Sequence, residues 1–321
     1  MMTERVSQRF CDLDQWPSVE AVEAMYEGQL AALAATKAAL KDIAHAADQA
    51  AARLGADGRL IYAGAGTSGR LAVQDGVELG PTYGWPADRL LFCLAGGMAA
   101  LTQSVEDAED HARDGRRAIR EAGTGGCDVV IGVAASGNTP FTLGVLEEAK
   151  ASGALTIAIA NNANTPILQA AHCPILAETG SELVAGSTRM KAGTAQKAIL
   201  NMLSTAIMLR LGRIYKGFMV NMVISNKKLR ARAINMVCDI AGCRPETADK
   251  ALDAADGDIK LAVLICLGHD PASSRDILAR AQGNLRVALA AQDKAAQDKA
   301  AQDKAAQDKA ALEKNEGAVG R

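Results

Sequence analysis

Two short turns rich in glycine, serine and threonine are the first places where this sequence could bind a ligand. They read GAGTSGR at 64–70 and ASGNTP at 135–140, and each follows an apolar run and precedes a helical stretch. Backbone N–H groups at a helix start favour an anion, hydroxyls add hydrogen-bond donors, and glycine permits close approach. The turns predict a phosphate site with these binding residues: Gly66, Thr67, Ser68, Gly69, Arg70, Ser136, Gly137, Asn138 and Thr139.

One glycine-rich turn alone is weak evidence, because it can simply connect two elements, and GAGTSG also resembles a dinucleotide-binding fingerprint. That fingerprint needs an acidic residue about 20 positions later, at the end of the next strand, to hold a ribose. The next apolar run, RLLFCLAGG at 89–97, contains none. Two such turns on separate strands therefore favour a single small phosphorylated molecule over a dinucleotide.

Five short apolar runs alternate with helical stretches and predict the sheet that carries both turns. Each run is apolar on both faces, as in a buried parallel strand. This alternation predicts an α/β fold with a doubly wound parallel sheet, whose carboxyl edge is the usual ligand crevice. The runs are 59–64, 89–96, 127–136, 154–161 and 173–178, and helices are expected over 67–79, 97–121, 140–152 and 164–171.

The segments around the predicted sheet are helical in pattern. Apolar residues at three- and four-residue spacing predict long helices over 19–54 and 188–211, the second capped by Ser187 or Thr188. Residues 226–268 contain three short helical blocks separated by glycine and proline. We therefore expect an N-terminal helical segment at 1–54, a ligand-binding domain at 55–225 and a small C-terminal three-helix domain at 226–289.

The sequence from residue 290 onward changes character. AAQDK occurs there four times in succession. A five-residue period advances about 140° around a helix, so no apolar stripe other than alanine can persist on one face. Residues 290–321 are expected to form a low-complexity, partly helical tail without a catalytic role.

Composition excludes several classes of protein. The 321 residues carry a net charge of -2, which offers no general attraction for nucleic acid or an acidic membrane. The four histidines show no HxH or HExxH spacing, and the seven cysteines include no CxxC pair, so no metal site is expected. No apolar run reaches membrane-spanning length. These features predict a soluble cytoplasmic protein that works without a metal.

A third string extends the pattern of the two turns. Both turns resemble those of the sugar isomerase (SIS) domain, which binds phosphosugars. The string GSELVAGSTRMKAGTAQK at 180–197 is similar to the signature of a narrower branch, the N-acetylmuramic acid 6-phosphate etherases and the related glucokinase regulatory proteins. The resemblance covers about residues 19–290 and includes NKKLRAR at 226–232. It adds Glu182 and Ser187 to the expected substrate-binding residues.

The resemblance implies a lyase reaction. Members of the etherase family cleave the D-lactyl ether of N-acetylmuramic acid 6-phosphate, giving N-acetylglucosamine 6-phosphate and D-lactate. They do so by elimination and then hydration of the ring-opened sugar, without metal or nucleotide, in cell-wall amino sugar recycling. The family's two catalytic glutamates fall here on Glu78, in QDGVELGPT, and on Glu109, in VEDAED.

Elimination explains why two carboxyl groups are needed. A base must take the hydrogen from C2, next to the open-chain aldehyde, while an acid protonates the ether oxygen on C3 as lactate leaves. We assign Glu109 as the base and Glu78 as the acid. Glu78 lies between Val77 and Leu79, which predicts an apolar neighbourhood, whereas the acidic residues around Glu109 are by themselves typical of a solvated helix face.

Four further charged residues in the third string admit two interpretations each. Glu182 could act on the substrate, as in some SIS isomerases, or could hold its loop by accepting N–H bonds. Arg189, Lys191 and Lys197 could receive the phosphate or the lactyl carboxylate, or could be solvated charges at a helix end.

Two other functions use the same turns. An isomerase acting on another amino-sugar phosphate would need no acid aimed at C3, and a non-catalytic sensor like the glucokinase regulatory branch would bind a phosphosugar and a protein. That branch typically has tandem SIS domains in a much longer chain, and only one set of turns occurs here. A homodimer is expected, because the long apolar helices exceed what one small-residue sheet can cover and because SIS proteins resemble one another in pairing.

Overall fold

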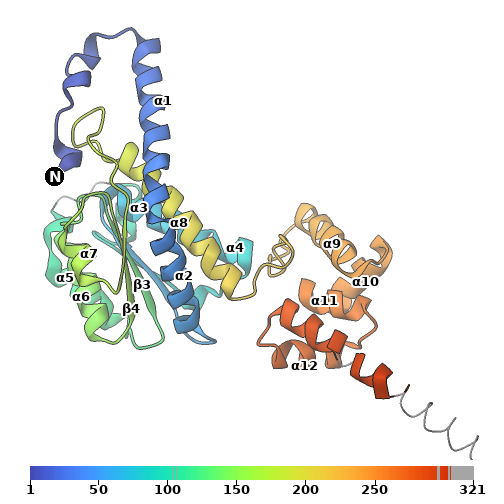
Figure 1. The fold of residues 1–321 in the computed structure, drawn as a ribbon. Coiled ribbons are helices and arrows are strands. Elements are labelled where there is room, and N and C mark those ends of the chain that lie inside the picture. Colours follow the sequence, from blue (N-terminus) through green and yellow to red (C-terminus); the bar gives the residue numbers. More distant parts are fainter. Residues whose placement is uncertain (104, 106, 295–296, 303, 305–321) are drawn as a thin grey trace, which may run out of the picture. The chain divides into compact units, whose positions relative to one another are not determined.

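The computed structural model describes residues 1–103, 105, 107–294, 297–302 and 304. The chain forms two compact units, Met1–Leu211 and Gly212–Arg321 (Figure 1). No helix in the described part of the chain combines the length and the apolar character that crossing a bilayer requires.

A five-stranded parallel sheet forms the centre of the first unit, as the alternating pattern predicts. The strand order is β2-β1-β3-β4-β5, which is a doubly wound arrangement. In the register, Gly64 pairs with Leu94 on one side and with Val133 on the other, so the carboxyl ends of these strands lie level. The strands are β1 (Leu60–Gly64), β2 (Leu90–Leu94), β3 (Val129–Ala134), β4 (Leu155–Ala160) and β5 (Cys173–Leu176).

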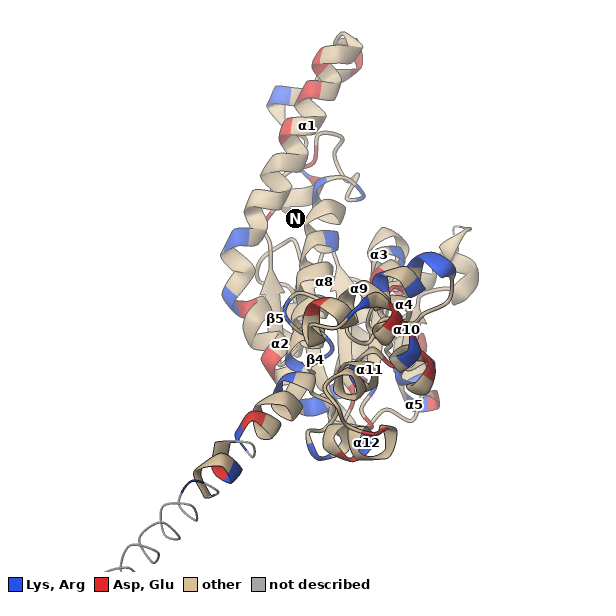
Figure 2. Cartoon of the chain, turned by 90° about the vertical axis from the view of Figure 1, so that its right-hand side faces the viewer, with Lys and Arg blue, Asp and Glu red and all other residues tan. Residues whose placement is uncertain are grey.

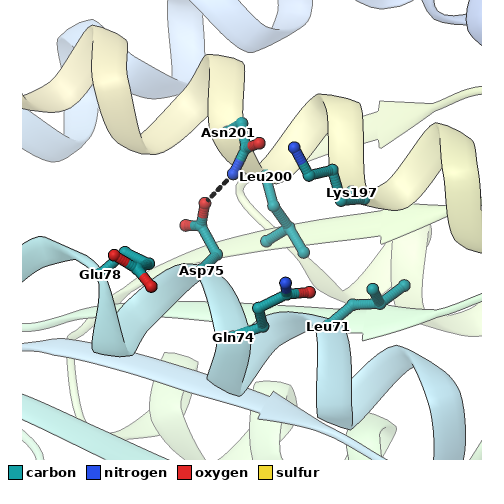
Figure 3. A pocket seen from close by; sticks show the side chains of 7 residues that line it. All are labelled: Leu71, Gln74, Asp75, Glu78, Lys197, Leu200 and Asn201. Atoms are coloured by element: carbon teal, nitrogen blue, oxygen red, sulfur yellow. Dashed lines mark hydrogen bonds between the residues drawn. The ribbon is translucent and has the colours of Figure 1, made fainter.

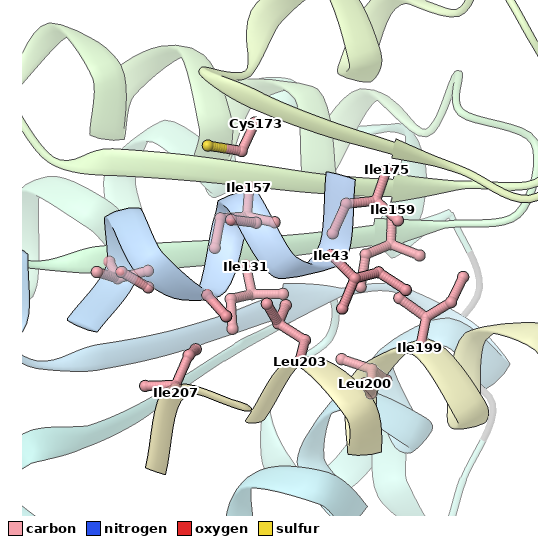
Figure 4. Packing of buried hydrophobic residues seen from close by; sticks show 14 of the residues in the cluster. Ile43, Ile131, Ile157, Ile159, Cys173, Ile175, Ile199, Leu200, Leu203 and Ile207 are labelled. Carbon is pink, nitrogen blue, oxygen red and sulfur yellow. The ribbon is translucent and has the colours of Figure 1, made fainter. Parts of the chain in front are cut away.

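Helices cover both faces of this sheet because successive strand residues point to opposite sides. One face packs against α2 (Leu40–Leu54), α3 (Gly66–Val77) and α8 (Lys191–Arg210), around Ile131 and Ile157 (Figure 4). The other face packs against these helices: α5 (Ala112–Glu121), α6 (Pro140–Ala151) and α7 (Pro166–Ala170). The prediction of a doubly wound α/β fold is confirmed.

The predicted helix over 19–54 consists of α1 (Ser18–Ala35) and α2 joined by the 3-10 turn η4 (Thr36–Ala39). Along α1, five large apolar side chains recur at three- and four-residue spacing and are each more than half exposed: Val19, Val22, Tyr26, Leu30 and Leu33. The last eight residues of α1, 28–35, carry no charge, and this half of the helix is tan in Figure 2. The helix therefore leaves one apolar stripe uncovered within the chain.

The predicted helix over 97–121 is wrong in its first half. Only α5 forms, and two short 3-10 turns precede it, η6 (Met98–Leu101) and η7 (Ala108–Asp110). Gly97 and Asp107 adopt left-handed backbone angles, with φ of 70° and 58°, which a helix cannot contain. The remaining short elements of the unit are η1 (Met2–Glu4), η2 (Gln8–Phe10), η3 (Leu13–Gln15), α4 (Leu79–Tyr83) and η5 (Ala87–Arg89).

The second unit is helical and has its own core. Residues Tyr215, Val220 and Met222 belong to that core, so the segment 212–225 packs with the helices that follow it. The three helices expected over 226–268 are present, and a fourth follows them. They are α9 (Lys227–Ala241), α10 (Pro245–Ala254), α11 (Ile259–Cys266) and α12 (Pro271–Arg280). Of the predicted tail, residues 295–296, 303 and 305–321 lie outside the described residues.

Candidate functional site

The two Ser/Thr-rich turns lie side by side at one edge of the sheet. The first turn leaves β1 and enters α3, and the second leaves the adjacent strand β3 and enters α6. The chain order reverses between these two strands, which is the point where open α/β sheets bind ligands. The architecture therefore brings together the residues that the sequence predicted for phosphate binding.

Close packing between strand and helix explains Gly64 and Gly69 of the first turn. A Cβ atom on Gly69 would lie 2.2 Å from Leu94 Cδ1 and 2.9 Å from the carbonyl carbon of Gly64. No side chain fits at that position, so α3 starts directly against the end of β1. Ser68, in the first turn of α3, is buried with 8% of its surface exposed.

A serine hydroxyl fixes the second turn. The backbone N–H of Asn138 donates to Ser136 Oγ at 3.1 Å. Gly137 has a φ of +71°, and a Cβ atom there would lie 2.2 Å from Thr165 Oγ1. Left-handed geometry and the close approach of Thr165 both require glycine, so this loop has a defined shape before any ligand arrives.

Asn162 ties the second turn to the first residues of the chain, a link that no sequence motif indicated. Its side-chain amide donates to the carbonyl of Ala135 at 2.9 Å and to Thr3 Oγ1 at 3.1 Å, and its oxygen accepts from the Met2 N–H at 2.8 Å. Thr3 is fully buried, and its carbonyl accepts from the Gly186 N–H at 3.1 Å. The segment 1–4 thus connects the Ser136 turn with the loop that contains Ser187.

Arg70 holds a loop. Its guanidinium donates to the carbonyls of Ala100 and Gln103, at 3.0 and 3.3 Å. These residues belong to the segment between β2 and α5, which also carries Glu109. Arg70 therefore fastens that segment to the first turn of α3.

Glu182 caps α8. It is fully buried, and its two carboxylate oxygens accept the N–H groups of Lys191 and Ala192, each at 2.9 Å. Of the two roles considered for this residue, the loop-holding one fits the structure, because neither oxygen faces an open site. The predicted cap by Ser187 or Thr188 is wrong, since α8 starts at Lys191 and Glu182 satisfies its first donors.

Glu78 lies at the opposite end of α3 from the phosphate turn. It follows the last helical residue and lines a pocket of about 390 Å³, including the solvent at its mouth. The side chain is exposed, as is that of Val77, so the predicted apolar neighbourhood is wrong. The other residues of the pocket, shown in Figure 3, are Leu71, Gln74, Asp75, Lys197, Leu200 and Asn201.

Asp75 forms the floor of this pocket and was not singled out by the sequence. Its carboxylate accepts hydrogen bonds from Tyr62 Oη at 2.9 Å, Asn201 Nδ2 at 2.6 Å and Ser204 Oγ at 3.2 Å. Burial raises the pKa of Asp75, and the three donors and the charge of Lys197 oppose that rise. The signal in the sequence is an acidic residue with small or apolar neighbours, namely Ala72, Val73, Gly76 and Val77.

Glu109 does not line the Glu78 pocket. It lies in η7, exposed, within the segment that Arg70 fastens beside the phosphate turn. Glu78 is eleven positions after Thr67, which is about 16 Å along the axis at a helical rise of 1.5 Å per residue. Within one chain the structure therefore gathers the two turns at one end of α3 and Glu78 at the other.

Metal ligands do not cluster in the described residues, where no group of three His, Cys, Asp or Glu side chains is suited to hold an ion. The donors at the two turns are hydroxyl and backbone N–H groups, which can donate hydrogen bonds to an anion. The described part of this site is thus suited to a phosphorylated ligand.

Two protein-family models match the chain. The one described as the glucokinase regulatory protein N-terminal SIS domain matches residues 41–150, and that of the SIS domain matches residues 102–206. Together they include both turns and both candidate glutamates. The resemblance inferred from the sequence motifs is confirmed.

Three relatives match along nearly their full length, and each is named an N-acetylmuramic acid 6-phosphate etherase. The protein from Deinococcus radiodurans is 43% identical over 288 residues, which is 89% of this chain and 94% of the relative. The first such protein of Bacillus licheniformis is 39% identical, covering 92% and 97% of the two chains. The Salmonella typhimurium protein is 42% identical, covering 90% and 98%. The chain therefore belongs to the N-acetylmuramic acid 6-phosphate etherase family.

Proposed function

We infer that this chain is a carbon–oxygen lyase that cleaves the D-lactyl ether of N-acetylmuramic acid 6-phosphate. The observation that carries this inference is the match to etherases at about 40% identity over about 90% of both chains. The paired turns support it, because they offer an anion site at the switch point of the sheet. The products are N-acetylglucosamine 6-phosphate and D-lactate.

The two glutamates divide the proton transfers. Glu109 takes the C2 hydrogen as a proton, a C2–C3 double bond forms, and the C3–O bond breaks. Glu78 gives its proton to the departing ether oxygen, so that D-lactate leaves with a hydroxyl group. Water then adds at C3, with Glu78 accepting a proton from the water and Glu109 returning one to C2. The net reaction consumes one water molecule and leaves both carboxyl groups as they began.

The turns hold the phosphate through hydroxyl and amide donors. Replacing Ser68 or Ser136 by alanine is expected to raise the Kd for N-acetylglucosamine 6-phosphate about tenfold, because each charge-assisted hydrogen bond contributes about 1.5 kcal/mol. The Kd for unphosphorylated N-acetylglucosamine should change much less. Titration calorimetry with both sugars measures the difference, and equal losses for the two sugars would contradict the assignment.

We propose that the enzyme is a homodimer whose active sites combine two chains. From the C6 phosphate to C3 the substrate spans five single bonds of about 1.5 Å, or less than about 8 Å. In one chain the backbone positions of Thr67 and Glu78 are about 16 Å apart along the axis of α3, which is about twice that span. Arg70 anchors Ala100 and Gln103 of the segment that also carries Glu109, so we assign the turns and Glu109 to one chain and Glu78 to the other.

The stripe on α1 supports a second copy of this chain as the partner. Its five apolar side chains, from Val19 to Leu33, are all more than half exposed. Monomeric soluble proteins rarely leave such a contiguous apolar surface in water. Pairing with a second copy would cover it, and light scattering at micromolar concentration should give twice the mass of the chain.

We also propose that the enzyme works in the cytoplasm. All seven cysteines are free thiols, as is usual for proteins of a reducing compartment. Cys11 and Cys127 are exposed to solvent, so the chain is suited to such conditions.

The direct test of the function is product formation. The purified chain incubated with N-acetylmuramic acid 6-phosphate is expected to release D-lactate and N-acetylglucosamine 6-phosphate in equal amounts, with unphosphorylated N-acetylmuramic acid as the control substrate. A lactate dehydrogenase specific for D-lactate quantifies one product, and mass spectrometry the other. The reaction run in H₂¹⁸O should place ¹⁸O at C3 of the sugar and none in the lactate. Absence of D-lactate at high enzyme concentration would refute the proposal.

A further inference from the structure

The pocket beside Glu78 has two walls of defined chemistry. On α3, four residues at helical spacing face it, namely Leu71, Gln74, Asp75 and Glu78, and on α8 the residues Lys197, Leu200 and Asn201 face them (Figure 3). Among these side chains Lys197 is the cation and Glu78 the exposed carboxyl group, and two leucines supply apolar surface. A ligand group that fits here has an anionic end, a small apolar part and an atom that can be protonated.

The Lys197 ammonium is available to such a group. None of the hydrogen bonds or ion pairs recorded for the described residues uses its Nζ atom, and its side chain is exposed. The nearby carboxylate of Asp75 already accepts three hydrogen bonds, from Tyr62, Asn201 and Ser204. Lys197 therefore lies near the negative charge of Asp75. No hydrogen bond or ion pair recorded for the described residues joins the two side chains.

We propose that this pocket is the subsite for the lactyl group and that Lys197 binds its carboxylate, an assignment that rests on the proposed function. In the lactyl ether the carboxylate and the methyl group are attached to the carbon that also carries the ether oxygen. A residue that protonates that oxygen must therefore share its pocket with the residue that holds the carboxylate. Glu78 and Lys197 share this pocket, and Leu71 and Leu200 offer surface to the methyl group.

The two charges at the pocket are not paired with each other. Glu78 and Lys197 form no ion pair within 4.0 Å in the described structure. A lactyl group between them would accept one hydrogen bond at each end, each about 2.8 Å long. Lys197 would thus select for substrates that carry the lactyl carboxylate and would leave recognition of the phosphosugar itself unchanged.

The test compares two ligands that differ only in the lactyl group. In a Glu109→Gln background, which prevents turnover, Lys197→Met is expected to raise the Kd for N-acetylmuramic acid 6-phosphate about tenfold or more. The Kd for N-acetylglucosamine 6-phosphate should stay within about twofold. Lys197→Arg keeps the charge and should retain most of the affinity for the first ligand. Arg210→Met, at the far end of α8 where Arg210 pairs with Asp48, is the matched control.

A second measurement separates binding from other effects of the charge. With Glu109 intact, Lys197→Met should reduce kcat/KM for N-acetylmuramic acid 6-phosphate but leave it nearly unchanged for the methyl ester of the lactyl carboxyl group. Equal losses with both substrates, or equal weakening of both sugar phosphates, would overturn the assignment of Lys197. Failure of the proposed function is distinct, because the unsubstituted chain would then release no D-lactate.

Discussion

Replacing Glu78 or Glu109 by glutamine is expected to lower kcat at least about a hundredfold while leaving the Kd for the substrate within about threefold. Glutamine keeps the size and polarity of each side chain but neither donates nor accepts a proton at neutral pH. Both side chains are exposed in the described structure, so neither change should unfold the protein. D-lactate release under saturating substrate gives kcat, and calorimetry on the inactive variants gives Kd.

The two variants should differ in the half-reaction that each retains. Glu78→Gln leaves the C2 base intact, so exchange of the C2 hydrogen with deuterium from solvent should continue although lactate is not released. Glu109→Gln should abolish that exchange. Glu121→Gln is a suitable control, because this glutamate is an exposed residue that pairs with Arg117 on the surface of α5, and its activity should equal that of the unsubstituted chain. Equal loss of binding and turnover in either variant would instead indicate a structural role.

Mixing two defective variants is expected to restore activity at substrate concentrations well below KM, where the weaker phosphate binding of the serine variant also lowers the rate. Chains with Glu78→Gln are mixed with chains that carry Ser68→Ala and Ser136→Ala, unfolded together and refolded so that the subunits exchange. Random pairing makes half of the dimers hybrid, and each hybrid has one site built from two intact halves. Activity should therefore rise from about one per cent of that of the unsubstituted enzyme, in the unmixed variants, to about a quarter.

The recovery discriminates between shared and separate sites. If turns and Glu78 of the same chain formed one site, every hybrid would contain two defective sites and mixing would restore nothing. A mixture of Glu109→Gln with the same serine variant is the control, because Glu109 and the turns are assigned to one chain and should not complement each other. Recovery in that control would move Glu109 to the other subunit.

The sheet could be predicted from the sequence because its signal is local. Runs such as 127–136 and 154–161 are apolar on both faces, and only a parallel strand covered on both sides buries every residue of such a run. The helix predicted over 97–121 is wrong in its first half, because the structure of that segment depends on non-local contacts. Its composition is compatible with a helix, but the backbone at Gly97 and Asp107 is left-handed, and contacts such as those from Arg70 fix a loop there.

The site was predicted in part. The position of the two turns could be predicted because hydroxyl and glycine residues repeat after two strands, and their role in phosphate binding stays a prediction. Asp75 and Asn162 were missed because each acts through partners far away in the chain. Asp75 meets Asn201 and Ser204, more than 120 residues later, and Asn162 meets Thr3, 159 residues earlier. No spacing in a single sequence reports such contacts.

The sequence by itself determined the strands, the turns that we propose as the phosphate site and the family to which the chain belongs, because these depend on residue types at short spacing. Only the tertiary structure decided that Glu182 caps a helix, that Arg70 holds a loop and that Glu78 lies a whole helix length away from the turns. Short-range patterns follow from backbone geometry and from the burial of neighbouring side chains. Which carboxyl group meets which donor depends instead on how distant segments pack, and that is fixed only when the chain has folded.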